Sequence, residues 1–156
     1  MSQPRVTVFD RHRDLYLASG GAEGHIYDLA NLGTSGLLPT LLLRTIGRKS
    51  GAVHILPLIY GVYGNEWVIV ASKGGSPAHP AWYHNLMAMP DVVFQVATQA
   101  FRATCREAAG EERERVWDYM ARLFPPYVTY QARATDRLIP VVMMKPVEPV
   151  PVLTGD

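Results

Sequence analysis

The sequence has one cysteine, Cys105, among its 156 residues. A single cysteine excludes an internal disulfide and is compatible with a reducing compartment. No apolar run reaches the roughly 18 residues that a membrane-spanning helix needs. The first residues also lack the basic segment followed by an apolar one that marks a secretory signal peptide. We therefore expect a cytoplasmic protein without a transmembrane segment.

The sequence also lacks an excess of charge of either sign. It holds 15 Lys and Arg against 14 Asp and Glu, a formal net charge of +1. A general nucleic-acid binder would carry a basic excess or stripe, so we expect no nucleic-acid partner. The length suits one domain with a sizeable core. We expect a single domain over 1–156, with an N-terminal helix and glycine-rich segment at 1–36, a core at 37–146 and a tail at 147–156.

Several nucleotide and metal motifs are missing as well. The glycine-rich segment at 19–24 is not followed by the Gly-Lys-Ser/Thr of a Walker loop, and no Gly-x-Gly-x-x-Gly follows a strand-like run. A Rossmann site for a nicotinamide cofactor is therefore disfavoured. His79 and His84 would lie on different faces of a helix, which argues against a zinc pair. No carboxylate completes a triad with Ser72, and we expect no metal site.

What the sequence does contain is a series of short apolar runs separated by turns. This pattern is typical of antiparallel hairpins, and Pro57 indicates an edge or bulge position in its strand. We expect an α+β or mainly β fold, a small β-barrel of about six mostly antiparallel strands with two or three flanking helices. The proline-rich tail from Pro146 is expected to be peripheral. Strands are predicted at 37–46, 53–63, 66–72, 92–97, 100–107 and 138–144, and helices at 9–18, 80–89 and 109–123.

The stretch from 71 to 85 combines a strand end, a glycine pair and the start of a helix. Gly74 and Gly75 permit close backbone approach and positive φ, and Lys73 adds a positive charge beside them. Pro80 suits the first turn of the helix that follows. A Gly-Gly loop with a cation before a helix can bind an anion, although a surface turn is the alternative.

A second basic turn, 47–51, carries Arg48 and Lys49 between two glycines. Such turns offer N–H groups and charge to phosphate or carboxylate, and closure of a barrel would bring both turns to the same region. Trp82 and Tyr83 are either core residues or a wall for a flat heterocycle, and Asn85 could hydrogen-bond to backbone or ligand. With no evident nucleophile, a bound organic cofactor is expected to carry the difficult step.

At these segments the sequence resembles the deazaflavin (F420)-dependent nitroreductase family, the F420H2-dependent quinone and nitro reductases with a split β-barrel related to FMN-binding barrels. The resemblance covers about 20–146, most of the chain. It implies F420 as the cofactor, with FMN as the alternative. The matching segments are 21–26, 41–51, 71–75, 79–86 and 136–141.

The resemblance also implies the site residues. Ser72, Tyr127 and Tyr130 are the candidate catalytic residues that shape the substrate pocket. A third tyrosine position of the nitroreductases is Phe124 here, which argues against nitroimidazole reduction. The segment 31–36 also looks longer than in many relatives. The implied cofactor-binding residues are Arg48, Lys49, Ser50, Ala71, Ser72, Lys73, Gly74, Gly75, Pro80, Trp82, Tyr83 and Asn85.

The resemblance implies an F420H2-dependent reductase that transfers hydride from reduced deazaflavin to a small electron-poor acceptor. The acceptor would be a quinone, an activated enone or a nitroaromatic. Two alternatives stay open: an FMN-dependent split-barrel oxidoreductase, and a non-catalytic F420-binding protein. The protein could be a monomer or a homodimer. The basic face of the helix at 9–18 could contact a membrane surface peripherally or be solvated.

Overall fold

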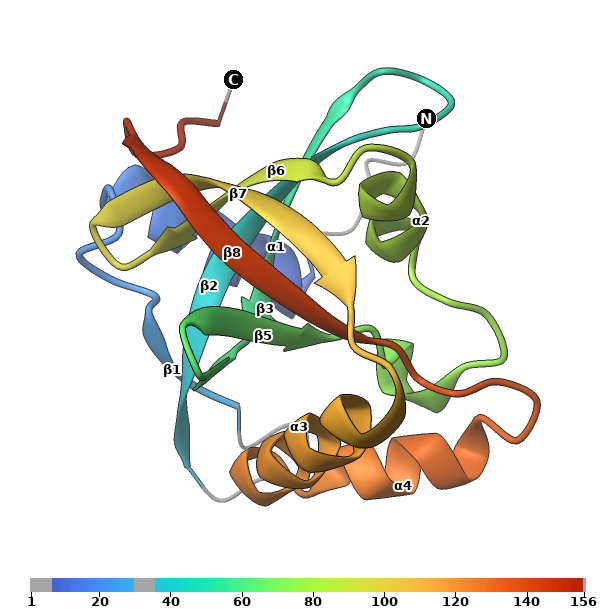
Figure 1. The fold of residues 1–156 in the computed structure, drawn as a ribbon. Coiled ribbons are helices and arrows are strands. Elements are labelled where there is room, and N and C mark those ends of the chain that lie inside the picture. The colour runs from blue at the N-terminus through green and yellow to red at the C-terminus, as the bar shows by residue number, and fades with distance from the viewer. Residues whose placement is uncertain (1–6, 30–35, 156) are drawn as a thin grey trace, which may run out of the picture.

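A computed structural model describes residues 7–29 and 36–155, so the segment at 31–36 lies almost entirely outside the described residues. An antiparallel sheet forms the body of the molecule, and helices surround it (Figure 1). The strands are β1 (Ile26–Asp28), β2 (Leu37–Ile46), β3 (Val53–Ile59), β4 (Gly61–Tyr63), β5 (Glu66–Val70), β6 (Asp91–Val96), β7 (Gln99–Glu107) and β8 (Val141–Val150). The helices are α1 (Val8–Ala18), α2 (Ala81–Ala88), α3 (Gly110–Leu123) and α4 (Pro126–Arg133), with a short 3₁₀ turn η2 (Lys73–Gly75).

The described strands form one eight-stranded sheet in the order β1-β2-β6-β7-β8-β5-β4, and β3 pairs with β2. The pairings are antiparallel, as the hairpin pattern predicts. The hydrogen-bonded path ends at β4 without returning to β3, so the barrel is split rather than closed. β3 is an edge strand, which is where a proline such as Pro57 is tolerated.

The strand expected at 53–63 is two strands with a corner at Tyr60. Its first part, β3, pairs with β2, and its second part, β4, pairs with β5. Packing explains the glycine that follows the corner. A Cβ on Gly61 would lie 2.6 Å from Met120 Sδ and 2.7 Å from Tyr119 Cε1 on α3. The chain therefore turns where only glycine leaves room for α3.

The expectation of a peripheral tail from Pro146 is wrong. β8 continues to Val150, and Pro149 lies opposite Phe101 of β7. Beyond the strand, Leu153 is buried, and its N–H donates to Gln95 Oε1 at 2.7 Å. The prolines suit this strand because its outer part pairs with β7 alone, after β5 has ended.

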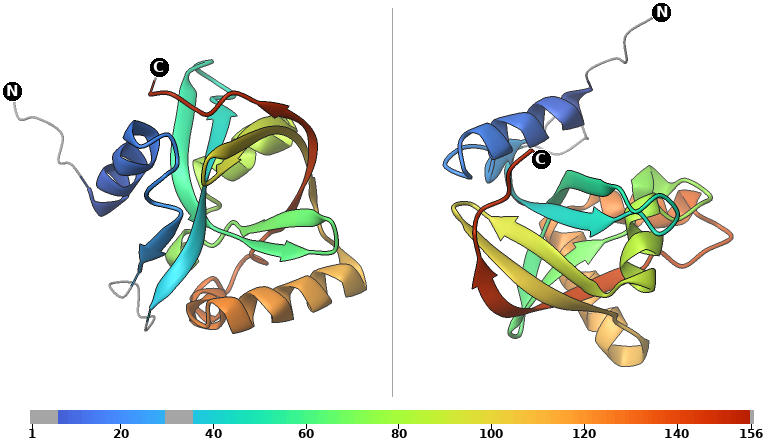
Figure 2. Two further views of the ribbon diagram at one scale, coloured as in Figure 1. Left: turned by 90° about the vertical axis from the view of Figure 1, so that its left-hand side faces the viewer. Right: turned by 90° about the horizontal axis from the view of Figure 1, so that it is seen from above.

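A helix that the sequence did not suggest follows α3. The pair Pro125-Pro126 reads as a stop, and it does end α3, but Pro126 is also the first residue of α4. A proline in the first turn of a helix loses no hydrogen bond, because that N–H has no partner within the helix. α3 and α4 lie together at one end of the barrel, as the left panel of Figure 2 shows.

α1 lies beside the split barrel, next to β3 (Figure 2). The Thr7–Asp10 capping box sets its start. Tyr16 anchors it: the phenol donates to the Thr40 carbonyl at 2.9 Å and accepts from the Ala97 N–H at 2.8 Å. Burial raises the pKa of Tyr16 to about 12. Among the described helices, none is long and apolar enough to cross a membrane.

Candidate active site

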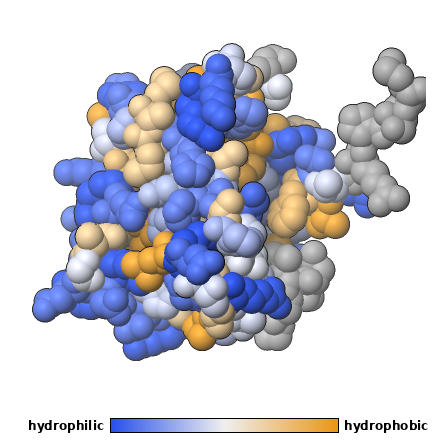
Figure 3. All heavy atoms as spheres, turned by 90° about the vertical axis from the view of Figure 1, so that its right-hand side faces the viewer, coloured by the Kyte–Doolittle hydropathy of each residue, from blue (hydrophilic) through white to orange (hydrophobic). Residues whose placement is uncertain are grey.

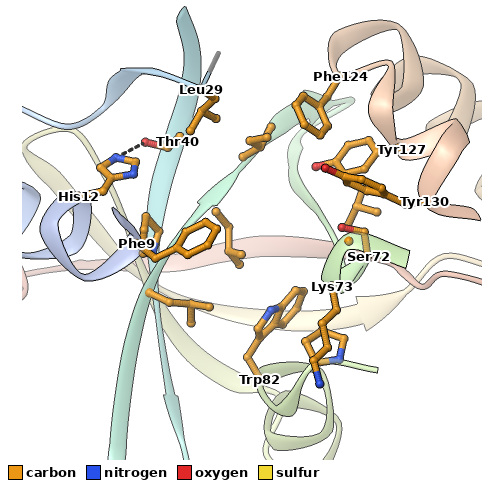
Figure 4. Close-up of a pocket in the computed structure, with 17 residues that line it drawn as sticks. Phe9, His12, Leu29, Thr40, Ser72, Lys73, Trp82, Phe124, Tyr127 and Tyr130 are labelled. Carbon is orange, nitrogen blue, oxygen red and sulfur yellow. Dashed lines mark hydrogen bonds between the residues drawn. The ribbon is translucent and has the colours of Figure 1, made fainter. Parts of the chain in front are cut away.

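A cavity of about 360 Å³ lies between α1, the β2–β3 hairpin, the loop after β5, and α4. Figure 4 shows α1 and β2 on one side of it and α4 on the other. Most of its walls are apolar, with a few polar groups among them, which is the usual make-up of a ligand pocket. The lining residues are Phe9, His12, Leu29, Thr40, Leu56, Pro57, Leu58, Ile59, Val70, Ser72, Lys73, Gly74, Pro80, Trp82, Phe124, Tyr127 and Tyr130.

The loop after β5 contributes backbone groups as well as side chains. The backbone of Ser72 is in the right-handed helical region (φ −78°, ψ −39°), whereas Lys73 (φ 46°) and Gly74 (φ 63°) are in the left-handed region. A right-handed residue followed by a left-handed one turns successive N–H groups toward the same side, an arrangement that binds anions. The loop predicted to bind an anion thus has the required backbone, and it opens onto the cavity.

Gly75 fixes this loop against α4. Its φ is +81°, and a Cβ there would lie 2.5 Å from the Tyr130 carbonyl oxygen. Glycine is therefore required on both conformational and steric grounds. The close approach places Ser72 and the tyrosines of α4 on one cavity.

Two tyrosine hydroxyls enter the cavity from α4. Tyr127 and Tyr130 are three residues apart on one helix face, and their rings are 6.3 Å apart. Their oxygens and that of Ser72 point into the cavity in Figure 4. Tyr127 is buried, and burial together with Tyr130 raises its pKa. Phe124 packs edge-on to Tyr127, at 4.9 Å between ring centroids, and contributes an apolar wall.

The opposite wall holds residues that the sequence analysis did not select. His12 of α1 stacks on Tyr27 at 3.7 Å between ring centroids, and its Nε2 is 2.8 Å from the Gly24 carbonyl oxygen. Burial lowers the pKa of His12, although the Gly24 carbonyl opposes the shift. The spacing of His12 and Tyr16, both buried and four residues apart, was the available signal. Phe9 lies on the same wall and is 56% exposed.

α2 begins after Pro80, as predicted, and carries Trp82 into the cavity wall. Trp82 is also a core residue, 7% exposed, which confirms the first of its two interpretations. Its role as a wall for a heterocycle stays a prediction. Tyr83 lies outside the lining, where its hydroxyl donates to Glu107 Oε1. Ala71 and Gly75 are buried beside the cavity rather than in its lining.

The basic turn between β2 and β3 lies outside this cavity. Arg48, Lys49 and Ser50 are exposed. The Arg48 backbone N–H and its Nη1 donate to Asn85 Oδ1 at 3.2 and 3.1 Å, so the turn is tied to α2. Asn85 is buried and also donates to Thr45 Oγ1 at 3.4 Å. Asn85 therefore bonds to protein, as one of its two predicted roles requires.

A second cavity of about 400 Å³ adjoins the first beside α2 and β3. It is lined by Arg13, Val53, His54, Ile55, Leu56, Ala81, Trp82 and Asn85. Leu56 and Trp82 line both cavities. The turn with Lys73 therefore lies at the first cavity, whereas the turn with Arg48 reaches the second only through Asn85. Closure of the sheet does not bring the two turns together.

His79 and His84 are closer than expected, at 5.7 Å between ring centroids. His79 precedes α2, so helical spacing does not separate the two rings. Over 7–29 and 36–155, no group of three or more His, Cys, Asp and Glu could hold a metal ion.

The chain resembles known proteins over most of its length. The family model described as F420H(2)-dependent quinone reductase matches residues 4–146. An F420H2-dependent quinone reductase of Mycobacterium tuberculosis is 36% identical over 142 residues, which is 89% of this chain and 90% of that protein. A solved F420H2-dependent reductase, FDR-A, is 39% identical with a TM-score of 0.64, over 78% of this chain and 98% of the other. A structure described as a domain-swapped dimer is 36% identical with a TM-score of 0.66, over 86% and 95% of the two chains.

Proposed function

The chain belongs to the F420H2-dependent quinone reductase family, and from this we propose that it is an F420H2-dependent oxidoreductase that reduces a quinone-like acceptor. One observation of the structure supports the proposal most. The loop at Ser72–Gly74, the indole of Trp82 and the hydroxyls of Tyr127 and Tyr130 all line one largely apolar cavity. A flat cofactor with an anionic tail and an apolar acceptor both suit such a site.

We propose that the deazaflavin binds against Trp82 and Pro80, with Lys73 and the neighbouring N–H groups toward its anionic part. The cofactor tail would then extend past Leu56 and Trp82, which line both cavities, toward Arg48 and Lys49. Arginine and lysine suit phosphate and carboxylate groups. When bound, reduced F420 supplies the hydride.

The protein groups of the cavity act on the acceptor. Ser72 and Tyr130 are proposed to donate hydrogen bonds to the acceptor oxygen, where negative charge develops during reduction. Tyr127 has a raised pKa and so remains protonated at neutral pH, which keeps it a donor beside them. Apolar walls from Phe9, α1 and α4 exclude water and orient the acceptor. The final proton comes from one of these hydroxyls or from water.

The apolar wall of the cavity favours a quinone over a smaller polar compound as the acceptor. Phe124 and Leu29 add apolar surface without a hydrogen-bond donor, and Phe124 is 1% exposed. A quinone ring offers an oxygen to the tyrosines while its apolar substituents contact these side chains. Activated enones and nitroaromatics remain further acceptors of the same electron-poor class.

We also propose a cytoplasmic protein that contacts the membrane peripherally through α1. Val8, Phe9 and Leu15 of this helix are exposed, and Phe9 also lines the cavity. An apolar acceptor dissolved in the bilayer would reach the site on this side. Flotation with anionic vesicles is expected to carry the wild-type protein, and release of Phe9→Ser from the vesicles would support the contact. Wild-type protein that stays with the unbound fraction would contradict it.

The oligomeric state is proposed to be a homodimer, by analogy with the relative described as a domain-swapped dimer. Light scattering should then give about twice the chain mass of 17.3 kDa. A measured mass equal to one chain would instead indicate a monomer.

The activity is tested by anaerobic oxidation of reduced F420 in the presence of a quinone, an enone or a nitroaromatic. We expect oxidation that depends on the protein and is fastest with the quinone. Tight F420 binding without turnover of any acceptor would favour a non-catalytic F420-binding protein. Flavin that copurifies with the protein and is required for turnover would favour an FMN-dependent oxidoreductase.

A further inference from the structure

Arg137, in the segment between α4 and β8, has a guanidinium directed at the loop that lines the cavity. Its Nε donates to the Ser76 carbonyl at 2.9 Å, and its Nη2 donates to the Ser72 carbonyl at 2.7 Å. Its Nη1 donates to the Ala71 carbonyl at 3.1 Å and to His79 Nδ1 at 2.9 Å. One side chain therefore binds three carbonyls and one ring of the segment 71–79.

These contacts distinguish Arg137 from an anion ligand. A guanidinium has five N–H donors, and four of them point at protein acceptors. Because arginine only donates, His79 Nδ1 must accept, and the proton of a neutral His79 lies on Nε2. The side chain is thus engaged with the protein before any ligand arrives.

Arg137 is itself held in place by Gln131 of α4. Gln131 Nε2 donates to the Arg137 carbonyl at 2.9 Å, and Gln131 Oε1 accepts from the Ile139 N–H at 2.9 Å. Gln131 Nε2 also donates to the Ala134 carbonyl at 3.2 Å, so these bonds hold the backbone before, at and after Arg137. The guanidinium is therefore presented to the loop from a fixed backbone.

The loop needs such support because its conformation is unfavourable for its sequence. Lys73 is left-handed at φ 46°, a region that non-glycine residues rarely occupy unless the surroundings impose it. Within the loop, the Gly75 N–H bonds to the Ser72 carbonyl and the Ser76 N–H to the Lys73 carbonyl. Arg137 binds the carbonyls of Ser72 and Ser76, on either side of the left-handed residues.

We propose that Arg137 is a positioning residue that holds the loop at 72–76 in the conformation that binds the anionic part of the cofactor. The identity of the ligand as F420 rests on the proposed function, whereas the effect of Arg137 on the loop does not. If only a fraction of the molecules hold the loop in the binding conformation, the apparent affinity for the cofactor falls in proportion to that fraction. Once the cofactor is bound, the loop is ordered in either case. Loss of Arg137 should therefore change affinity rather than the rate at saturation.

The variant Arg137→Lys keeps the charge but carries its donors on a single nitrogen, so it cannot reproduce the planar fork that reaches three carbonyls and His79. We expect the Kd for F420 and the KM for reduced F420 to rise together by about tenfold or more, since hydrogen bonds to charged groups are strong. The kcat at saturating reduced F420 should stay near that of the wild type. In the protein without cofactor, hydrogen exchange of the peptide covering 71–79 should be faster than in the wild type.

Arg106→Lys is the matched control, because Arg106 is also an arginine whose guanidinium makes several hydrogen bonds within the protein. Its Nη2 donates to Glu66 Oε1 at 2.7 Å and its Nη1 donates to Glu112 Oε1 at 2.6 Å, and neither partner belongs to the loop or lines the cavity. We expect it to lower the unfolding midpoint while F420 affinity and exchange at 71–79 stay unchanged.

Two results would overturn the proposal: a fall in kcat with unchanged KM, or unchanged exchange at 71–79 in Arg137→Lys. If that variant does not fold, the wild type decides, since rapid exchange of the Gly75 and Ser76 amides in the cofactor-free protein would show that the loop is not held. Failure of the wild type to bind F420 would contradict the proposed function, and the exchange rates would still decide the role of Arg137.

Discussion

At the scale of single residues, the lining of the cavity consists of a few hydrogen-bond donors and of side chains that offer only apolar surface. Ser72 and the two tyrosines supply hydroxyls, while Phe124 supplies only a ring. Resemblance to the family identified Tyr127 and Tyr130 from sequence, but not why they share a cavity with Ser72. That depends on α4 and on the close approach of Gly75 to Tyr130. For His12, helical spacing indicates that it shares a face with Tyr16, but not that this face meets Thr40, which is distant along the chain.

Tyr130→Phe should lower kcat about tenfold to a hundredfold, because it removes one donor to a developing negative charge and keeps the ring. The Kd for F420 should change little. Steady-state kinetics together with an F420 titration measures both effects. Tyr63→Phe on β4, outside the cavity lining, is the control and should behave as the wild type. An unchanged kcat in Tyr130→Phe would remove this hydroxyl from the reaction.

Lys49→Ala should weaken F420 binding roughly threefold to tenfold, with a smaller loss at high salt, because Lys49 is exposed and its charge is screened. Titrations at two ionic strengths measure this. Lys145→Ala, an exposed lysine of β8, controls for loss of one positive charge. Equal affinity of Lys49→Ala and the wild type at low salt would show that the turn does not hold the tail.

At the scale of elements, short-range signals located most strands and helices but missed those decided by packing. Pro125-Pro126 ends α3 and also begins α4, and the sequence alone favoured only the first role. Pro146 and Pro149 suggested a loose tail, yet both lie in β8, where pairing with β7 compensates. The corner at Tyr60 is set by the approach of α3 to Gly61, which no local pattern reveals.

The contact between η2 and α4 predicts the effect of Gly75→Ala. The new Cβ would lie 2.5 Å from the Tyr130 carbonyl oxygen at a φ of +81°. We expect a loss of about 2–4 kcal/mol of unfolding free energy, since backbone strain and overpacking each cost about 1–3 kcal/mol. F420 binding should also weaken, because the loop shifts away from α4. Denaturant unfolding and an F420 titration measure the two effects.

Gly64→Ala is the control for this prediction. Its φ is +63°, and a Cβ there would meet nothing within 4 Å. It should therefore lose only the conformational part, about 1–2 kcal/mol, with normal F420 binding. Equal effects of the two substitutions would show that the contact with α4 is not tight.

At the scale of the whole molecule, the cavities of the split barrel lie where segments that are far apart in sequence come together. The antiparallel sheet was predictable because each hairpin is local, as with β6 and β7. The split between β3 and β4 depends on how the sheet bends, so only the resemblance to the family predicted it, and the structure confirms it. The exterior carries few broad apolar areas on the face shown in Figure 3, where hydrophobic side chains form separate patches among hydrophilic ones. The candidate site is a cavity and not one of these patches.

Folding also withdraws several histidines from water, and this predicts a pH dependence of stability. Burial lowers the pKa of His12 and of His25. Burial, Arg137 and His84 lower the pKa of His79, while Glu107 opposes this shift. As the pH falls, the unfolded chain therefore takes up protons near the ordinary histidine pKa of about 6.5, whereas the folded chain takes them up only at lower pH. The free energy of unfolding should therefore fall as pH drops below about 6.5 and level off once the folded histidines are also protonated.

Thermal unfolding between about pH 7.5 and pH 5 checks this prediction. We expect a lower midpoint at the acid end and a weaker dependence in His12→Gln. His54→Gln, which changes an exposed residue of β3, should keep the wild-type dependence. A midpoint that rises with acidity over this range would contradict the account.

The most direct test of the central claim is a titration of the purified protein with oxidised F420, with FMN and NADPH in parallel. The account predicts saturable binding of F420 and no comparable binding of the other two. It also predicts that Arg137→Lys weakens F420 binding while Arg106→Lys leaves it unchanged. Saturable binding of FMN without binding of F420 would contradict the deazaflavin function. Binding of none of the three would reduce both basic turns to surface loops.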